Sequence, residues 1–423
     1  MLELAKRDEM RRLVDRLLEA CADPRYERRK AMWTAHQHLQ KVAKVPVHVH
    51  LFLSGDYSPV WQELIPEEQL VHKEGVARNV ELQLRQRLYK HDNIPDDDVI
   101  LPVLFAGAVF RTAADRIWGL KLERREAQQG VYDGGAYKPV PPINAPDPGE
   151  GEIEALSLPQ VDIDEAATAR QVEQMQDLVE GRLPIIVSAN RLGESPIENA
   201  VDLRGMDNLL YDVLDRPAFV HRLMDFVTQA IIRCHREVDR LKRFDTPATW
   251  HGCRVHYEEV GPEVLQASSG IETAWAYISA QSAAGLSPAM FEEFLQPYHE
   301  RIASLYSPGR VYYHGCEDLT AKFRVIRRTP HLRRFHVSPW SDFRALAPQI
   351  GRDFVIEKHV HPTNNLLLFT EEQMRSELEE ALAIGGDLVM DLNLSDIHTV
   401  GHRPERLTTW ARLAQQVTEQ HSR

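Results

Sequence analysis

Four apolar segments decide the fold class of this chain: RVYYHGCED (310–318), RRFHVSPWSD (333–342), FVIEKHVHP (354–362) and DLVMDLNLSDIHT (387–399). Each segment ends in polar side chains. Three segments with helical patterns separate them: LTAKFRVIRRT (319–329), FRALAPQIG (343–351) and EEQMRSELEEALAIGG (371–386). Alternating strands and helices at intervals of roughly 20–35 residues are typical of a parallel sheet. A (β/α)8 barrel and a doubly wound sheet both show this rhythm, and we predict the barrel.

The rest of the chain contains further strand and helix patterns. Apolar or alternating runs predict strands at 45–52, 99–110, 183–190, 248–257 and 275–281. Helices are expected at 1–43, 205–242 and 287–306, the last beginning at Ser287-Pro288. Residues 130–160 are rich in Pro and Gly and predict a loop or boundary. We therefore expect a distorted (β/α)8 barrel at 161–423, with residues 1–160 forming a helical and β extension packed on it.

Composition excludes several classes of partner. The 423 residues carry a net charge of −13 with no basic run, which argues against nucleic-acid binding. The four cysteines are widely spaced, and neither a signal peptide nor an apolar run of about 20 residues is present. The simplest expectation is a cytoplasmic protein with reduced thiols and no membrane contact.

The pair His314 and Cys316 ends the first of the four segments. Alternate residues of a strand share a face, so Tyr312 points the same way. In a barrel, the carboxyl ends of the strands form the active-site rim. The other three segments add polar or aromatic residues to this rim: Ser338, Trp340, Asp342, His359, His361, Asp391, Asp396 and His398.

Imidazole and thiolate are both good zinc ligands, and either His398 or Asp396 is placed to complete a site. A lone HxC pair is nevertheless a weak motif, because a buried cysteine is usually packing. The same spacing recurs at His251 and Cys253, where a half-buried strand end is the simpler explanation. Convergence of His and Asp at successive strand ends favours a metal site at His314 and Cys316.

Three further residues are candidates for substrate binding. Trp340 and Tyr312 would line a pocket at the rim, and Arg191 in ANRLGESP (189–196) would clamp an anionic group. The competing interpretations are a core aromatic for Trp340 and an ordinary surface loop for Arg191. Asp396 and His361 are candidate general acids.

These segments together resemble the uroporphyrinogen decarboxylase superfamily, and more closely its corrinoid-linked methyltransferase and O-demethylase-like branch. The resemblance extends from about residue 28 and is carried best by 202–226, 285–298, YYHGCEDL (312–319), FHVSPWSD (335–342) and DIHTVGHRPERLTTW (396–410). It implies a distorted (β/α)8 barrel and a zinc site built from the HxC pair and a later cysteine. No cysteine follows Cys316 here, so His398 or Asp396 replaces it or the site is incomplete. The arginine-rich N-terminal pattern of the true decarboxylases is absent.

The function implied is transfer of a methyl group from a small O- or N-methylated compound to a corrinoid (cobalamin) held by a separate carrier protein. Zinc would act as a Lewis acid, or Asp396 or His361 would protonate the leaving atom. A homodimer is a further expectation. Two alternatives stay open: a metal-free lyase or decarboxylase of the same superfamily, and a non-catalytic barrel that binds a small molecule.

Overall fold

The computed structural model describes residues 2–53, 55–125, 138–140, 142–244 and 270–422. Its strands are β1 (Val47–Val49), β2 (Leu104–Gly107), β3 (Glu123–Arg125), β4 (Lys138–Val140), β5 (Ile185–Ser188), β6 (Ala276–Ser279), β7 (Val311–His314), β8 (Leu332–Val337), β9 (Val355–His359) and β10 (Val389–Leu394). Eight of them, all except the β3–β4 hairpin, are parallel to their partners.

The eight parallel strands follow the order of a barrel. Six form one sheet in the order β1-β10-β9-β8-β7-β6, and the other two, β2 and β5, pair with each other. The first strand, β1, pairs with the last, β10, as neighbouring strands of a barrel do, and an open doubly wound sheet lacks this pairing. Val47 lies opposite Leu392, and Val49 lies opposite Leu394. The arrangement is a distorted (β/α)8 barrel whose strands form two hydrogen-bonded sets.

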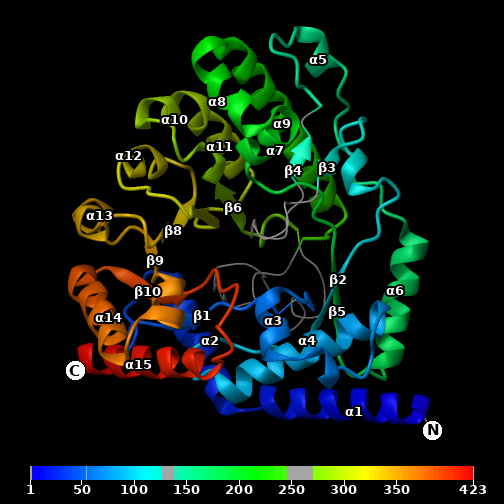
Figure 1. The fold of residues 1–423 in the computed structure, drawn as a ribbon, viewed down its shortest axis with the longest axis vertical. Helices are drawn as coiled ribbons and strands as arrows, with labels where there is room; N and C mark the ends of the chain where they lie inside the picture. The colour runs from blue at the N-terminus through cyan, green and yellow to red at the C-terminus, as the bar shows by residue number, and fades with distance from the viewer. Residues whose placement is uncertain (1, 54, 126–137, 141, 245–269, 423) are drawn as a thin grey trace.

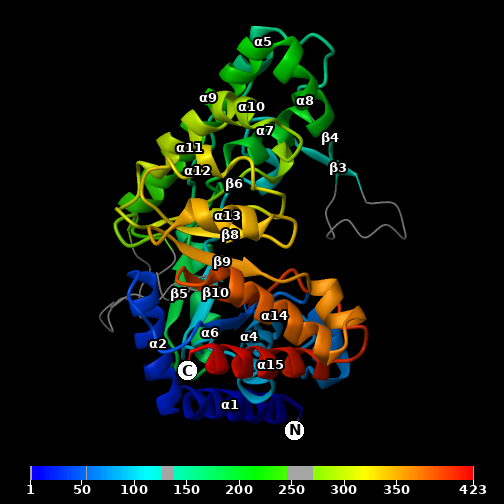
Figure 2. The ribbon, with the colours of Figure 1, turned by 90° about the vertical axis from the view of Figure 1, so that its left-hand side faces the viewer.

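Helices surround the strands. They are α1 (Leu2–Cys21), α2 (Pro24–Gln37), α3 (Pro59–Leu64), α4 (Gly75–Asn93), α5 (Glu150–Glu154), α6 (Glu165–Leu178), α7 (Pro196–Arg204), α8 (Met206–Asp215), α9 (Pro217–Arg240), α10 (Pro288–Phe294), α11 (Gln296–Ala303), α12 (Phe323–Ile326), α13 (Phe343–Ile350), α14 (Glu371–Gly385) and α15 (Glu405–His421). The described residues also form the short 3-10 helices η1 (Glu67–Gln69), η2 (Ala114–Arg116) and η3 (Gln281–Ala283) and the π-helix η4 (Asn364–Leu368). Figure 1 shows α10 to α15 following one another around the outside of β6 to β10. Figure 2 shows α1 at one end of the molecule, beneath α15, and the antiparallel strands β3 and β4 at one side.

Two hydrophobic clusters support this arrangement. The larger cluster fills the space between the six-stranded sheet and its helices. The smaller one joins α1, α2, α4 and α6 to the β2–β5 pair. The helices begin where local chemistry favours it: Ser287 accepts a hydrogen bond from the Met290 amide at the start of α10, and Thr370 forms a capping box with Gln373 at α14. Among the described residues, no helix is both long enough and apolar enough to cross a membrane.

The predicted strands are confirmed wherever the chain is described. The runs at 45–52, 99–110, 183–190 and 275–281 contain β1, β2, β5 and β6, and the four segments of the last third contain β7 to β10. The strand expected at 248–257 lies outside the described residues. The boundary at residue 160 stays a prediction, but strands from both sides of it pair, because β2 precedes it and β5 follows it.

The two faces of β7 to β10 differ sharply. On one face, alternate residues are buried polar side chains that contact one another: Tyr312, His314, Arg334, His336, Glu357, His359, Asp391 and Asn393. On the opposite face the alternate residues are Tyr313, Phe335, Ile356 and Leu392, which join the larger hydrophobic cluster. The period of two in a strand therefore separates a polar face from a face that packs against the helices.

Candidate metal centre

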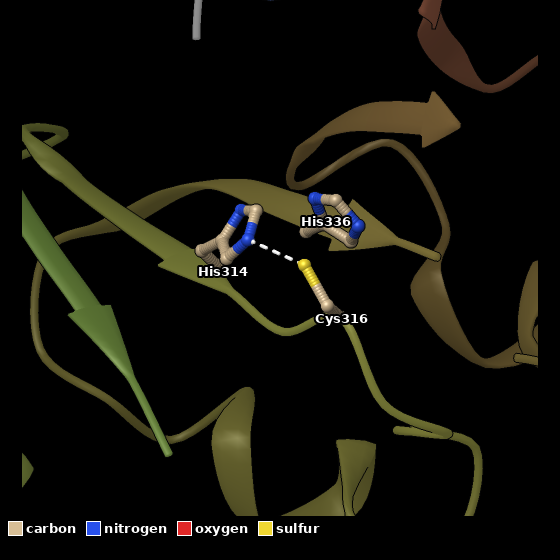
Figure 3. Close-up of side chains that lie close together, drawn as sticks. All are labelled: His314, Cys316 and His336. Carbon is tan, nitrogen blue, oxygen red and sulfur yellow. Dashed lines mark hydrogen bonds between the residues drawn. The ribbon is translucent and has the colours of Figure 1, made fainter. Parts of the chain in front are cut away.

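Three side chains that coordinate metals well meet at the carboxyl ends of β7 and β8. Figure 3 shows His314 and His336 on neighbouring strands, with Cys316 just beyond the end of β7. Their ligand atoms all lie within 4.8 Å of one another. The Nε2 atom of His314 is 3.1 Å from the Cys316 sulfur, and the two imidazole rings are 4.2 Å apart between centroids. Two histidines and one cysteine form a donor set typical of zinc.

His336 has the property that a metal ligand needs. Burial lowers its pKa well below the usual value for histidine, so the ring is neutral and keeps a nitrogen lone pair. Its Nε2 atom is buried and has no hydrogen-bond partner among the described residues. A buried polar atom without a partner is costly, and a bound metal ion would supply the missing interaction. The site therefore fits a zinc ion.

A hydrogen-bond network lies beneath the two histidines. The Tyr312 hydroxyl is 2.9 Å from Nδ1 of His314, 3.1 Å from Nδ1 of His336 and 2.6 Å from Oε1 of Glu357. Arg334 donates to Oε2 of Glu357 at 2.6 Å. Burial by itself would raise the pKa of Glu357, but the Arg334 charge and the hydrogen bonds from His359 and Tyr312 outweigh it and hold that pKa well below its usual range.

Arg334 connects this network to strand β10 and helix α2. Its guanidinium also donates to Asp391, at 3.0 Å from Oδ2. Asp391 in turn lies 2.9 Å from Nε2 of His36 on helix α2. All four side chains of this chain of contacts, including Glu357, are buried. Buried charges of opposite sign with hydrogen bonds on both sides form a fixed support for the centre above them.

Two other groups of converging ligands are already satisfied internally. His359 donates through Nε2 to Glu357 at 2.8 Å, and its Nδ1 is 2.5 Å from the Ser395 hydroxyl. His48 lies near Asp96 and Asp98. There the Lys90 ammonium is 2.5 Å from Asp98 and supplies the positive charge. The first of these groups shares His336 with the candidate centre, and among its described ligand atoms only Nε2 of His336 lacks a hydrogen-bond partner.

Cys316 is half-buried at the rim. Burial, reinforced by the nearby Asp396 carboxylate, raises the pKa of its thiol. The thiol is therefore protonated in the metal-free protein, and a coordinated zinc ion would reverse this by displacing the proton. Asp396 Oδ2 is 3.6 Å from the sulfur, so the predicted candidate acid does lie beside the predicted ligand. Its φ of 55° is a left-handed conformation, which aspartate tolerates.

The other predicted rim residues divide into two groups. Trp340 is 57% exposed, and its ring meets His361 edge-on with centroids 4.7 Å apart. These two side chains follow β8 and β9, and their roles in substrate binding and acid catalysis stay predictions. Ser338 instead donates its hydroxyl proton to the carbonyl of Glu317, the residue after Cys316, at 2.7 Å. Asp342 accepts a hydrogen bond from the Ala345 amide and caps α13.

Arg191 and His398 lie apart from the converging ligands. The Arg191 guanidinium donates to the Thr112 carbonyl at 2.5 Å and lies over the Phe110 ring at 4.4 Å. His398 is exposed after β10, and within the described part of the chain the groups of converging ligands do not include it. A substrate clamp at Arg191 and a ligand role for His398 stay predictions. His251 and Cys253 lie outside the described residues.

His336 and the supporting Arg334 and Glu357 were missed by sequence reasoning. His336 has the same parity as Ser338 in RRFHVSPWSD, so the rule that placed His314 beside Cys316 also places it on the polar face. The Arg334–Glu357 contact joins two strands, and neither residue carries a local pattern that marks it.

Comparison with known proteins supports the fold. No family model matches the chain, and a search of curated proteins finds no match. Among solved structures, a methyltransferase from Methanosarcina mazei has a similar structure, with a TM-score of 0.53 and 16% sequence identity. The match covers 92% of this chain and 98% of that chain. A likeness at this identity shows a shared fold over almost the whole chain, and the predicted α/β fold class is confirmed.

Proposed function

We propose that this protein is a zinc-assisted methyltransferase that moves a methyl group from a small O- or N-methylated substrate to a corrinoid held by a carrier protein. The observation that carries the proposal is the convergence of His314, Cys316 and His336 at the carboxyl ends of β7 and β8. This is the end of a (β/α)8 barrel at which active sites lie. The fold shared with a methyltransferase supports the reaction class.

In the proposed centre, His314 and His336 bind zinc through Nε2 and Cys316 binds it through sulfur. When bound, the zinc ion supplies a Lewis acid that draws electron density from the leaving atom of the methyl donor. Three protein ligands leave a coordination position for substrate, as in catalytic zinc sites generally. The same centre in a metal-free protein would hold a protonated thiol at Cys316 and a neutral imidazole at His336, which offer no comparable polarisation.

The reaction balances with one proton. The bond from the methyl carbon to oxygen or nitrogen breaks, and its electron pair stays on the leaving atom. The new carbon–cobalt bond uses the electron pair of cobalt(I), which becomes formally cobalt(III). An O-methyl donor then takes up one proton and leaves as the alcohol or phenol.

The chain offers two groups for this proton. Asp396, next to the Cys316 sulfur, and His361, beside Trp340, follow β10 and β9 at the rim. Either would act as the general acid for the leaving atom. Trp340 would supply an apolar wall that holds the donor and limits access of water. Arg191 is proposed to recognise a carboxylate on the donor after release from its contact with Thr112.

Methyl transfer to free cobalamin tests the proposal. Zinc-loaded protein and cobalamin reduced to cobalt(I) are mixed with methoxylated aromatic acids, methoxylated aliphatic acids or methylamines, and formation of methylcobalamin is followed by absorbance. We expect at least one donor class to react and Cys316→Ala to lower the rate at least about 100-fold, since one ligand is lost. Cys234→Ala, at a buried free cysteine on α9, is the matched control and should react like wild type.

Two results would remove parts of the proposal. Wild-type rates in Cys316→Ala would take the metal out of the mechanism. No transfer from any donor, together with release of carbon dioxide from an acid without cobalamin, would support the lyase or decarboxylase alternative. Tight binding of a donor without any turnover would support a binding role.

A further inference from the structure

The hydroxyl of Tyr312 contacts the Nδ1 atoms of both histidines of the candidate centre, His314 and His336. It lies on β7, buried beneath the HxC pair, and also contacts Glu357. We infer that Tyr312 is a positioning residue that fixes His314 and His336 as Nδ1–H tautomers, so that both present an Nε2 lone pair to one metal ion. This inference rests on the zinc centre of the proposed function.

The direction of each hydrogen bond follows from the groups involved. Glu357 forms an ion pair with buried Arg334 at 2.6 Å and is therefore a carboxylate, which accepts hydrogen bonds and donates none. The Tyr312 hydroxyl must donate its one proton to Glu357. Its oxygen is then left with lone pairs only and accepts from its other two neighbours, so both Nδ1 atoms must carry the proton.

Nε2 of each ring behaves as this assignment requires. In His314, Nε2 lies 3.1 Å from the Cys316 sulfur, which also lies 3.6 Å from Oδ2 of Asp396, so this contact is compatible with the assignment and the Tyr312 contact selects the tautomer. In His336, Nε2 has no partner among the described residues. The Cys316 contact alone would accommodate the opposite tautomer in His314, because the thiol can donate to Asp396 while its sulfur accepts from Nε2. In His336 the opposite tautomer would leave a buried N–H without an acceptor and face a lone pair toward the lone pairs of Tyr312.

Ring contacts hold the same orientation. The His314 ring stacks on Tyr277 with centroids 5.0 Å apart and an interplanar angle of 27°. The His336 ring lies between His314 and His359, with centroid distances of 4.2 Å and 4.0 Å. These contacts restrict the tilt of the rings but do not choose which nitrogen carries the proton. Tyr312 is the group that makes that choice for both.

Groups that orient metal-bound histidines through their second nitrogen typically change metal affinity by about 10- to 100-fold. The test is zinc affinity of Tyr312→Phe, measured by competition with a chromophoric chelator. Tyr313→Phe is a matched control: Tyr313 is the next residue, equally buried, and its hydroxyl has no hydrogen-bond partner among the described residues. We expect Tyr312→Phe to bind zinc about 10- to 100-fold more weakly and Tyr313→Phe to bind as wild type does.

A spectroscopic measurement on wild type makes the test independent of how the variant folds. Nitrogen NMR of histidine-labelled, metal-free protein distinguishes the two tautomers, and His314 and His336 should both be protonated at Nδ1. Nε2 protonation of either ring, or unchanged zinc affinity in Tyr312→Phe, would overturn the inference while the zinc centre stands. Absence of zinc binding in wild type would overturn the metal-centre proposal itself, and the role of Tyr312 with it.

Discussion

Single residues on the polar face of the sheet owe their positions to strand alternation, and this is why the HxC pair was predictable. His314 and Cys316 are two residues apart, so a short stretch of sequence is enough to place them together. The Arg334–Asp391 contact is different, because its partners are 57 positions apart. This contact depends on the order of the strands in the sheet and on their register. No local pattern in a single sequence specifies either of these.

His299 shows how a buried titratable residue without a partner affects stability. It lies on α11, between the Phe291 and Tyr313 rings, and neither ring nitrogen has a hydrogen-bond partner among the described residues. Burial lowers its pKa to about 3. In the unfolded chain it would take up a proton near pH 6.5, so stability falls as the pH drops below 6.5 and continues to fall toward 3.

We therefore expect His299→Phe to become more stable relative to wild type as the medium is acidified. The advantage should grow by about 2 kcal/mol between pH 7 and pH 5, since each pH unit below the unfolded pKa costs about 1.4 kcal/mol. Urea unfolding of both proteins at the two pH values measures it. A difference in unfolding free energy that does not change with pH would show that His299 takes up its proton in the folded protein.

At the scale of secondary-structure elements, side chains that cap helices show where a helix begins. Asp342, which the sequence placed among the rim residues, accepts a hydrogen bond from the Ala345 amide at 3.0 Å and begins α13. Its side chain thereby satisfies an amide that has no partner within the helix. A carboxylate that follows a strand can serve either as a ligand or as a helix cap. Asp342 is a helix cap, because helix α13 begins directly after it.

Asp342→Ala should lower the free energy of unfolding by about 1 kcal/mol, the usual cost of removing a helix cap. Zinc content should stay as in wild type. Urea unfolding and elemental analysis check the two parts. Asp353→Ala is the matched control, because Asp353 is an exposed aspartate between α13 and β9 and should change neither. Loss of zinc in Asp342→Ala would place this carboxylate in the centre.

Strand periodicity gave the elements but left their grouping open. The runs that contain β1 and β2 are short and lie among helices. The regular alternation of strands and helices is clear only in the last third of the chain, so these two strands were predicted to belong to an N-terminal extension of the barrel. In the molecule, β1 pairs with β10 and β2 pairs with β5. These pairings join distant parts of the chain. The energy that selects them comes from burying both faces of the sheets, which local sequence does not report.

At the scale of the whole molecule, the fold depends on residues from both halves. A fragment of residues 161–423 would lack β1 and β2, leaving β10 with an open edge and β5 without its partner. It would also lose α1 and α4 from the smaller hydrophobic cluster. We expect this fragment to be aggregated or largely unfolded by circular dichroism and gel filtration. Cooperative thermal unfolding of a soluble fragment would instead support a domain boundary at residue 160.

The central claim is that His336 joins His314 and Cys316 in a zinc centre. Elemental analysis of wild type beside His336→Ala and His398→Ala tests it most directly. We expect about one zinc per chain in wild type, loss of zinc in His336→Ala and retention of zinc in His398→Ala. Full zinc content in His336→Ala, or loss of zinc in His398→Ala alone, would contradict it and place the third ligand after β10.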